Sequence, residues 1–331
     1  MDRRTFARTI TAVLAGLGIP SGRRGAARGS PPGGAASPFS TGVLPRTTLP
    51  TRRLGRTGLD VPILALGGHH VGRAASESDA RVLVETALEE GIRFFDNAES
   101  YQNGKAERWL GSALEGVRSD VMIMTKTHSP GDRSADSARR HLEGSLERLR
   151  TDYLDVWQLH STKSVEDVDR AFRSRGAMEY IMRAREEGLV RFVGVTGHVT
   201  PAAHRRALEY WDEGWRFDTF QFPINPIDYH QRSFQRQVLV DIVARDIGMI
   251  AMKTSADGRL LREGICTIEE TLGYVWSLPV NVAVVGMERP ELVRHNARLA
   301  REFEPMSPAD LQNLRDRIEP RADLALEWYK T

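Results

Sequence analysis

Short apolar runs alternate with amphipathic segments along most of this chain. The segments between the runs, such as 76–91 and 134–150, return apolar residues at spacings of three and four and place charges on the opposite face. That spacing predicts helices, whereas short apolar runs bounded by polar residues predict buried strands. The runs that we predict as strands are 62–67, 92–97, 121–126, 153–160, 191–197, 218–225, 248–254 and 281–287.

Strand and helix alternate eight times in this pattern, which predicts an α/β fold of the (β/α)8 TIM barrel type. A doubly wound sheet stays open as the alternative. Residues 52–64 contain a turn at Thr57-Gly58 and predict an N-terminal β-hairpin across the floor of the barrel. Ser307, Pro308 and Asp310 form a helix start signal, so a C-terminal helix is expected over 307–330.

The first 50 residues differ in composition from the rest. Arg3 and Arg4 precede Phe6 and an uncharged stretch from Thr9 to Pro20, which resembles a twin-arginine signal peptide. We therefore expect a signal and linker at 1–36, a flexible linker at 37–50 and the barrel at 51–331. This implies the twin-arginine export machinery as a partner and a periplasmic or other extracytoplasmic location. The alternative is an arginine-rich tail on a cytoplasmic protein.

Charge and cysteine content exclude several classes of protein. Residues 1–50 hold seven arginines and one acid, so the body carries a net charge of −4 within the total of +2. The body therefore offers no surface for nucleic acid, and no apolar run after the N-terminus is long enough for a stable membrane span. Cys266 is the single cysteine, which excludes a disulfide framework and a zinc or iron–sulfur site built from thiols.

Chemically active residues end three successive predicted strands. Asp96, Lys126 and His160 occupy these ends, and Tyr101 follows Asp96 by five positions. A lysine ammonium lowers the pKa of a neighbouring phenol, and a carboxylate keeps that lysine charged. A histidine N–H can stabilise an oxygen that becomes negative. Such a set would protonate a developing alkoxide, and because side chains supply no hydride, a nicotinamide cofactor is implied.

Three stretches around these residues resemble the aldo-keto reductase family over about residues 52–300. They are "FDNAESYQNGKAE" at 95–107, "IMTKT" at 123–127 and "WQLH" at 157–160. The resemblance implies a catalytic tetrad of Asp96, Tyr101, Lys126 and His160, with Tyr101 as the general acid. It also implies an aldehyde or ketone as the small-molecule substrate.

The later strands resemble a bacterial branch of the family that has Met-Lys on strand seven and Gly-Met on strand eight; the ferredoxin-like tail that many of its members carry has no counterpart here. In that branch Met252 would contact the nicotinamide and Lys253 the pyrophosphate. Glu288 disfavours a 2′-phosphate, whereas nearby arginines favour one, so NADPH is expected and NADH stays open. The cofactor-binding residues that the resemblance implies are Thr196, Gln221, Met252, Lys253, Gly286 and Asn296.

One departure from the family pattern and two alternative functions bear on what the protein does. Gly197 stands where the family has asparagine, and it is followed by His198. A metal site is not expected at the histidines near the mouth, because the adjacent His69 and His70 would point to opposite faces of a strand. A cofactor-binding redox sensor or accessory subunit with little turnover remains the alternative function. The loop at 255–264 is short and is expected to close loosely over the cofactor.

Overall fold

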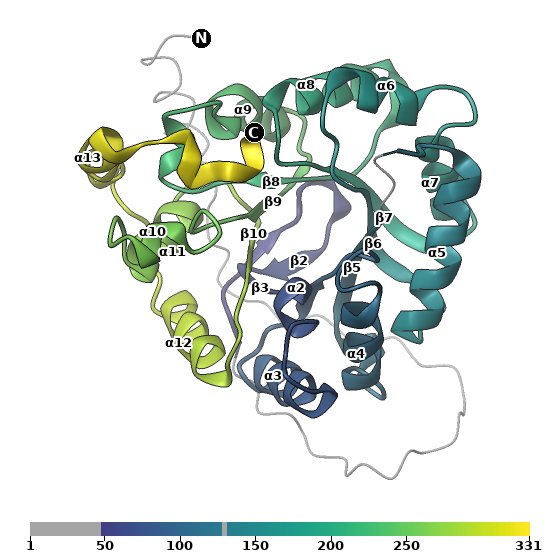
Figure 1. Ribbon diagram of the computed structural model, residues 1–331, viewed down its shortest axis with the longest axis horizontal. Helices are drawn as coiled ribbons and strands as arrows, with labels where there is room; N and C mark the ends of the chain where they lie inside the picture. Colours follow the sequence, from purple (N-terminus) through teal and green to yellow (C-terminus); the bar gives the residue numbers. More distant parts are fainter. Residues whose placement is uncertain (1–47, 128–130) are drawn as a thin grey trace.

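Parallel strands close into a barrel at the centre of the molecule, as seen in this computed structural model of residues 48–127 and 131–331 (Figure 1). The eight strands are β3 (Leu64–Gly67), β4 (Phe94–Asp96), β5 (Met122–Thr127), β6 (Leu154–Leu159), β7 (Val190–Thr196), β8 (Thr219–Pro223), β9 (Gly248–Met252) and β10 (Val282–Val285). They follow one another in chain order, and β10 pairs with both β9 and β3 to close the ring. The predicted barrel is confirmed, and the doubly wound alternative is excluded.

Helices surround the strands on the outside of the barrel. Several begin at a serine or threonine whose hydroxyl accepts a hydrogen bond from the first helical turn, such as Ser76, Ser134 and Ser164. The main helices are α3 (Glu77–Glu89), α4 (Lys105–Ala113), α5 (Ala135–Leu149), α6 (Val165–Phe172), α7 (Ala177–Glu186), α8 (Pro201–Tyr210), α9 (Val240–Ala244), α11 (Ile268–Trp276) and α12 (Pro290–Arg301). Two shorter helices, α2 (Gly68–Val71) and α10 (Arg259–Arg262), lie in loops that follow β3 and β9.

Alternate residues of each strand point into the barrel and out toward the helices. Phe94, Met124 and Val156 belong to a buried cluster in the interior, whereas their neighbours, such as Phe95, pack with the helices. Because side chains alternate along a strand, residues two positions further on also face the interior. Asp96 and Lys126 therefore stand directly above the interior apolar layer.

A two-stranded hairpin closes the floor of the barrel, as predicted. β1 (Thr51–Arg53) pairs with β2 (Asp60–Pro62) in antiparallel register. Leu54 and Val61 are fully buried and join the interior cluster, so the hairpin seals the end opposite the polar strand ends. The hairpin therefore covers the amino ends of the strands, away from Asp96 and Lys126.

The C-terminal region departs from the prediction. α13 (Pro308–Ile318) begins as expected, with Ser307 and Asp310 forming a capping box, but it ends twelve residues before Lys330. Pro320 explains the end, since proline lacks the N–H that an α-helix requires and clashes with the preceding turn. Two 3-10 stretches follow, η6 (Glu319–Arg321) and η7 (Leu324–Lys330). We call residues 323–330 the strap.

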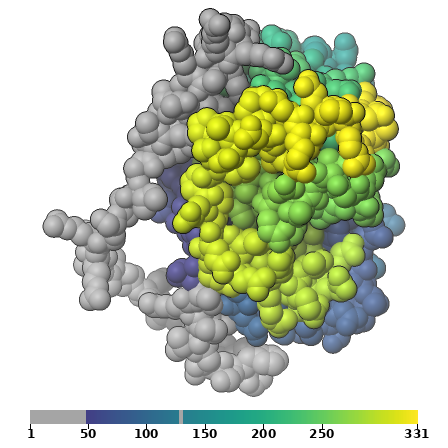
Figure 2. Space-filling model, turned by 90° about the vertical axis from the view of Figure 1, so that its left-hand side faces the viewer, coloured from purple at the N-terminus to yellow at the C-terminus, as the bar shows by residue number. Residues whose placement is uncertain are grey.

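The strap packs on the loop that follows β9. Arg259 donates a hydrogen bond of 2.9 Å to the carbonyl of Ala325, and Trp328 Nε1 donates one of 3.3 Å to Asp257. In Figure 2 the yellow C-terminal residues lie directly against the green residues of this region. The loop at 255–264, expected to close loosely, is thus tied to a second segment of the chain.

The signal and linker predictions for residues 1–47 lie outside the described residues. Where the description begins, Leu49 is already buried and the Pro50 carbonyl accepts a hydrogen bond from Ile63, so the packed body starts slightly before residue 51. None of the helices within 48–127 and 131–331 combines the length and apolar character needed to cross a bilayer.

Candidate active site

The four predicted catalytic side chains converge at the carboxyl ends of β4, β5 and β6. Asp96 ends β4, Lys126 lies near the end of β5, and His160 directly follows β6. Tyr101 lies in the loop after β4, with its ring 5.4 Å from the Lys126 ammonium and 6.2 Å from the His160 ring. Strand order and the inward alternation bring these residues together although 64 positions separate Asp96 from His160.

Asp96 and Lys126 form a buried ion pair at the centre of this group. Lys126 Nζ donates to Asp96 and also to the carbonyl of Asn97, at 2.6 Å. Gln221, on the opposite side of the ring, donates to the second carboxylate oxygen of Asp96 at 3.2 Å. Burial raises the pKa of Asp96 and lowers the pKa of Lys126, and the attraction between them opposes both shifts.

Tyr101 retains its proton in this arrangement. Burial raises the pKa of its phenol, and the negative charge of Asp96 raises it further. The predicted net lowering of this pKa is therefore wrong, because burial and the charge of Asp96 raise it. At neutral pH the phenol is present in its acid form, which is the form that a proton donor needs.

His160 is held by its backbone. Its N–H donates to the Thr127 carbonyl at 3.1 Å, and its own carbonyl accepts from Arg133 at 2.9 Å. Arg133 is buried and also binds Asp167 through two hydrogen bonds of 2.9 and 2.6 Å. This ion pair was not foreseen from the sequence, since nothing in the local pattern links Arg133 with an acid 34 positions away.

Two predicted cofactor-binding residues adjoin the tetrad. Thr196 and Gln221 face each other in the register of β7 and β8, and both are buried. Gln221 Oε1 has no hydrogen-bond partner among the described residues, and the same holds for the buried Asn296 Oδ1 on α12. Both atoms are acceptors, which suits the amide and amino N–H groups of a nicotinamide adenine dinucleotide. The residues present thus fit such a cofactor.

The other predicted cofactor contacts lie at the ends of β9 and β10. Met252 is the last residue of β9, and Lys253 follows it with a left-handed backbone (φ 53°) and an ammonium 2.8 Å from Asp257. Gly286 directly follows β10, where a side chain would overlap the His70 ring. A phosphate at Lys253 would therefore compete with the carboxylate of Asp257.

Gly197 departs from the family for a steric reason. A Cβ at this position would lie 2.5 Å from both the carbonyl and the hydroxyl oxygen of Thr162, so an asparagine does not fit. His198 turns instead to the strap, where its Nδ1 lies 3.0 Å from the Tyr329 carbonyl. The strand end thus has Thr196 for a cofactor contact but no side chain at the next position.

The histidines of the first loop lie on a helix. His69 and His70 belong to α2, so the prediction that they end a strand with opposite orientations is wrong. His69 packs edge-on against Tyr101 at 5.2 Å, and its Nδ1 lies 3.2 Å from Gln102. Within the described ranges, no three His, Cys, Asp or Glu side chains are arranged to hold a metal ion.

Comparisons with known proteins agree with this geometry. The sequence model of the "Aldo/keto reductase family" matches residues 63–270. The L-galactose dehydrogenase of Arabidopsis thaliana is 32% identical over 160 residues, which are 46% of this chain and 49% of that protein. The chain thus matches about half the length of this curated relative.

Two solved structures resemble the whole barrel. A putative aldo-keto reductase from Pseudomonas aeruginosa is 28% identical with a TM-score of 0.65, covering 80% of this chain and 99% of that one. An aldo/keto reductase from Klebsiella pneumoniae in complex with NADP and acetate is 25% identical with a TM-score of 0.65, covering 82% and 95%. These similarities extend over the strands that carry the predicted site.

Proposed function

Because the chain belongs to the aldo/keto reductase family, we propose that it interconverts a carbonyl and an alcohol by hydride transfer with NADPH. The observation that carries this proposal is the position of the Tyr101 phenol, whose ring lies 5.4 Å from the Lys126 ammonium and 6.2 Å from the His160 ring. An acid in this position suits an oxygen that gains negative charge during the reaction.

The chain's own residues would handle the oxygen and its proton. When bound, the reduced nicotinamide supplies the hydride to the carbonyl carbon. Tyr101 donates its phenolic proton to the carbonyl oxygen as that oxygen becomes negative, and the product is the alcohol. Lys126 stabilises the phenolate that remains, with Asp96 holding the ammonium in place. The His160 ring lies edge-on to the Tyr101 ring at 6.2 Å, and His160 would orient the substrate oxygen.

NADPH is the proposed cofactor and NADH the alternative. The Klebsiella pneumoniae relative is in complex with NADP, and the free acceptors of Gln221 and Asn296 suit either dinucleotide. Glu288 is exposed, and its carboxylate lies 3.7 Å from Nε2 of His70, whose pKa is lowered by burial, so at neutral pH this imidazole does not offset the charge of Glu288. The choice between the two cofactors is therefore a question for measurement.

A fluorescence titration with NADPH and with NADH would test the proposal first, followed by cofactor consumption with a panel of aldehydes and ketones. We expect micromolar binding and turnover with at least one carbonyl compound. Binding without turnover would favour the alternative function of a redox sensor or accessory subunit. No binding of either dinucleotide would contradict both.

Tyr101→Phe tests the assignment of the acid. Removing the hydroxyl leaves the ring contacts with His69 and His160, so the fold and dinucleotide affinity should change little. Turnover should fall by about 10²- to 10⁴-fold, the usual contribution of general acid catalysis. Nearly normal turnover in this variant would show that another group donates the proton.

We further infer that residues 1–36 direct export through the twin-arginine pathway. We also infer that the chain belongs to the bacterial branch that has Met252-Lys253 at the end of the seventh strand of the barrel, β9. The paired Arg3 and Arg4 ahead of Phe6 support the first inference. Fractionation of cells that express the full chain and the double variant Arg3→Lys, Arg4→Lys would test it. Equal export of both proteins, or export of neither, would contradict the pathway.

A further inference from the structure

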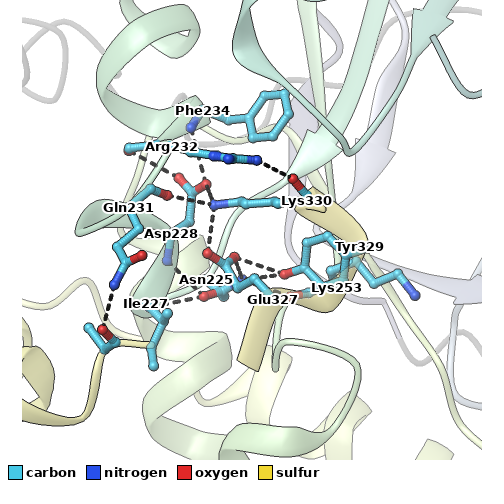
Figure 3. Close-up of polar contacts among 12 residues, drawn as sticks. Asn225, Ile227, Asp228, Gln231, Arg232, Phe234, Lys253, Glu327, Tyr329 and Lys330 are labelled. Carbon is cyan, nitrogen blue, oxygen red and sulfur yellow. Dashed lines mark hydrogen bonds and ion pairs between the residues drawn. The ribbon is translucent and has the colours of Figure 1, made fainter. Parts of the chain in front are cut away.

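A second buried lysine lies near the mouth, on the strap. The side chain of Lys330 is 0% exposed, and its ammonium donates to Asp228 Oδ1 and Glu327 Oε2, each at 2.6 Å, and to the Gln231 carbonyl at 3.0 Å (Figure 3). All three protons of the ammonium thus have acceptors. Lys330 is thus one of the residues through which the strap is bound to the loop after β8.

Asp228 is a fixed anchor for this lysine. Its two carboxylate oxygens accept backbone N–H groups from Phe234 and Gln235, at 3.1 and 2.9 Å, besides the hydroxyl of Ser233. Asp228 is itself fully buried. Because backbone N–H groups hold the Asp228 carboxylate in place, Asp228 fixes the position of Lys330, and Lys330 does not fix that of Asp228.

Tyr329, next to Lys330, contacts residues that follow three consecutive strands. Its carbonyl lies 3.0 Å from Nδ1 of His198 after β7, and its hydroxyl lies 3.1 Å from Nδ2 of Asn225 after β8. Its ring lies 5.5 Å from the ammonium of Lys253 after β9. The strap therefore closes the side of the mouth opposite the loop that carries Tyr101.

Asn225 forms hydrogen bonds with both the strap and Lys253. Its Nδ2 lies within hydrogen-bond distance of Glu327 Oε1, at 3.0 Å, and of the Lys253 carbonyl, at 3.2 Å. Figure 3 shows Asn225 beside Glu327 and Tyr329 of the strap. Lys253 has the left-handed backbone that a lysine adopts only when its surroundings impose it. Trp328 adds a ring 5.7 Å from the same ammonium.

We propose that Lys330 is a positioning residue for dinucleotide binding: by binding Asp228 outside the strap and Glu327 within it, Lys330 fixes Asn225 and Lys253 at the ends of β8 and β9. This inference rests on the proposed function, in which Lys253 contacts the dinucleotide. The phenol, ammonium and imidazole that handle the proton lie on other strands, so the strap acts on binding and not on proton transfer.

Lys330→Met in the full chain is the main test, since methionine keeps much of the volume and removes the ammonium. The Kd for NADPH, measured by fluorescence titration, should rise by roughly 2- to 30-fold, the range expected for residues that modulate a site indirectly. KM for NADPH should rise with it, while kcat at saturating NADPH should stay within about twofold of the wild type. A purely structural role would lower the amount of folded protein without separating KM from kcat.

Two further variants keep the test decisive if Lys330→Met folds poorly. Glu327→Gln retains the Lys330–Asp228 ion pair but weakens the contacts of Asn225 and Tyr329, and it should raise the Kd by a smaller factor. Thr331→Ala is the matched control. Thr331 directly follows the strap, and its substitution removes an exposed hydrogen bond from the Thr331 hydroxyl to the Trp328 carbonyl, so the Kd should not change.

The outcomes separate this inference from the function on which it rests. Folded Lys330→Met and Glu327→Gln proteins with wild-type Kd and KM would overturn the positioning role and leave the proposed function intact. A fall in kcat equal to the rise in KM would also overturn it. If the wild-type chain binds no dinucleotide, both the proposed function and the positioning role are wrong.

Discussion

Two buried lysines near the mouth of the barrel, Lys126 and Lys330, have different surroundings. Lys126 has one carboxylate, Asp96, and one carbonyl, and the ring of Tyr101 lies beside it. Lys330 has two carboxylates and one carbonyl, and one of the carboxylates, that of Asp228, is itself held by backbone N–H groups.

Under the proposed function, this difference would let one residue type serve two purposes. A lysine that must respond to a neighbouring phenol needs a single, limited set of partners, so that its charge can act on a group that changes during the reaction. A lysine whose three ammonium protons all bind fixed acceptors holds its segment of the chain in place. Burial is common to both, so the number and rigidity of the partners distinguish the two roles.

The largest expected effect is on turnover, and it separates the two lysines. Lys126→Met should lower kcat at saturating NADPH by about 10²- to 10⁴-fold, since Tyr101 loses the charge that stabilises its phenolate. Lys330→Met should leave kcat within about twofold. Steady-state kinetics on both purified variants, corrected for the fraction of folded protein, would measure this. Similar losses of kcat in both would remove the distinction.

Lys330→Met should affect the stability of the fold more than it affects turnover. Lys330→Met leaves two carboxylates buried without their cation and should lower the free energy of unfolding by about 3–5 kcal/mol. Adding Asp228→Asn should restore part of that loss, because one uncompensated charge is removed. Urea unfolding of the wild type, the single and the double variant is the measurement. A double variant less stable than the single one would show that Asp228 acts mainly through its other hydrogen bonds.

Gln221 tests the link between the two sides of the mouth. Gln221→Leu removes the hydrogen bond to Asp96 and the free acceptor Oε1 together. We expect a loss of about 1 kcal/mol in the free energy of unfolding and weaker NADPH binding by about tenfold, as for the loss of one buried hydrogen bond in each case. Calorimetric titration with NADPH would check it, and unchanged affinity would exclude Oε1 from cofactor binding.

The smallest expected effect concerns Glu99, in the loop between Asp96 and Tyr101. Burial raises the pKa of its carboxyl to about 7, Arg148 opposes the rise and Glu107 adds to it. The folded protein therefore binds more protons than the unfolded chain between about pH 4.5 and 7, so stability falls as the pH rises through this range. Because the side chain is partly exposed, we expect a contribution on the order of 1 kcal/mol.

Glu99→Gln should remove that part of the pH dependence. Unfolding of the wild type and the variant in urea at pH 5 and pH 8 would measure the difference. An equal change in stability for both proteins between the two pH values would contradict the raised pKa of Glu99.

The barrel could be predicted from the sequence because parallel strands that are buried on both faces read as continuous apolar runs. Each of the eight predicted runs overlaps an observed strand, and only β5 and β7 extend beyond their runs, by one residue each. The positions of Asp96 and Lys126 could also be predicted, since they end such runs and share the inward alternation of Phe94 and Met124.

The strap could not be predicted in the same way. The predicted start of α13 is confirmed. The prediction that the helix continues to residue 330 is wrong, because Pro320 ends it. The burial of Lys330 depends on Asp228, which lies 102 positions away, and no local pattern marks such a pair. The predicted direction of the Tyr101 pKa shift is wrong for a similar reason, since the shift depends on the burial of the phenol and on its distance from Asp96 in the folded chain.

Cys266 has a practical consequence. Its thiol is buried, and burial raises its pKa to about 11, so the reactive thiolate is scarce at neutral pH. Peroxides and alkylating reagents should therefore attack this residue slowly while the protein is folded. A cysteine introduced at an exposed position could carry a fluorescent label on the native background, without prior removal of the natural thiol.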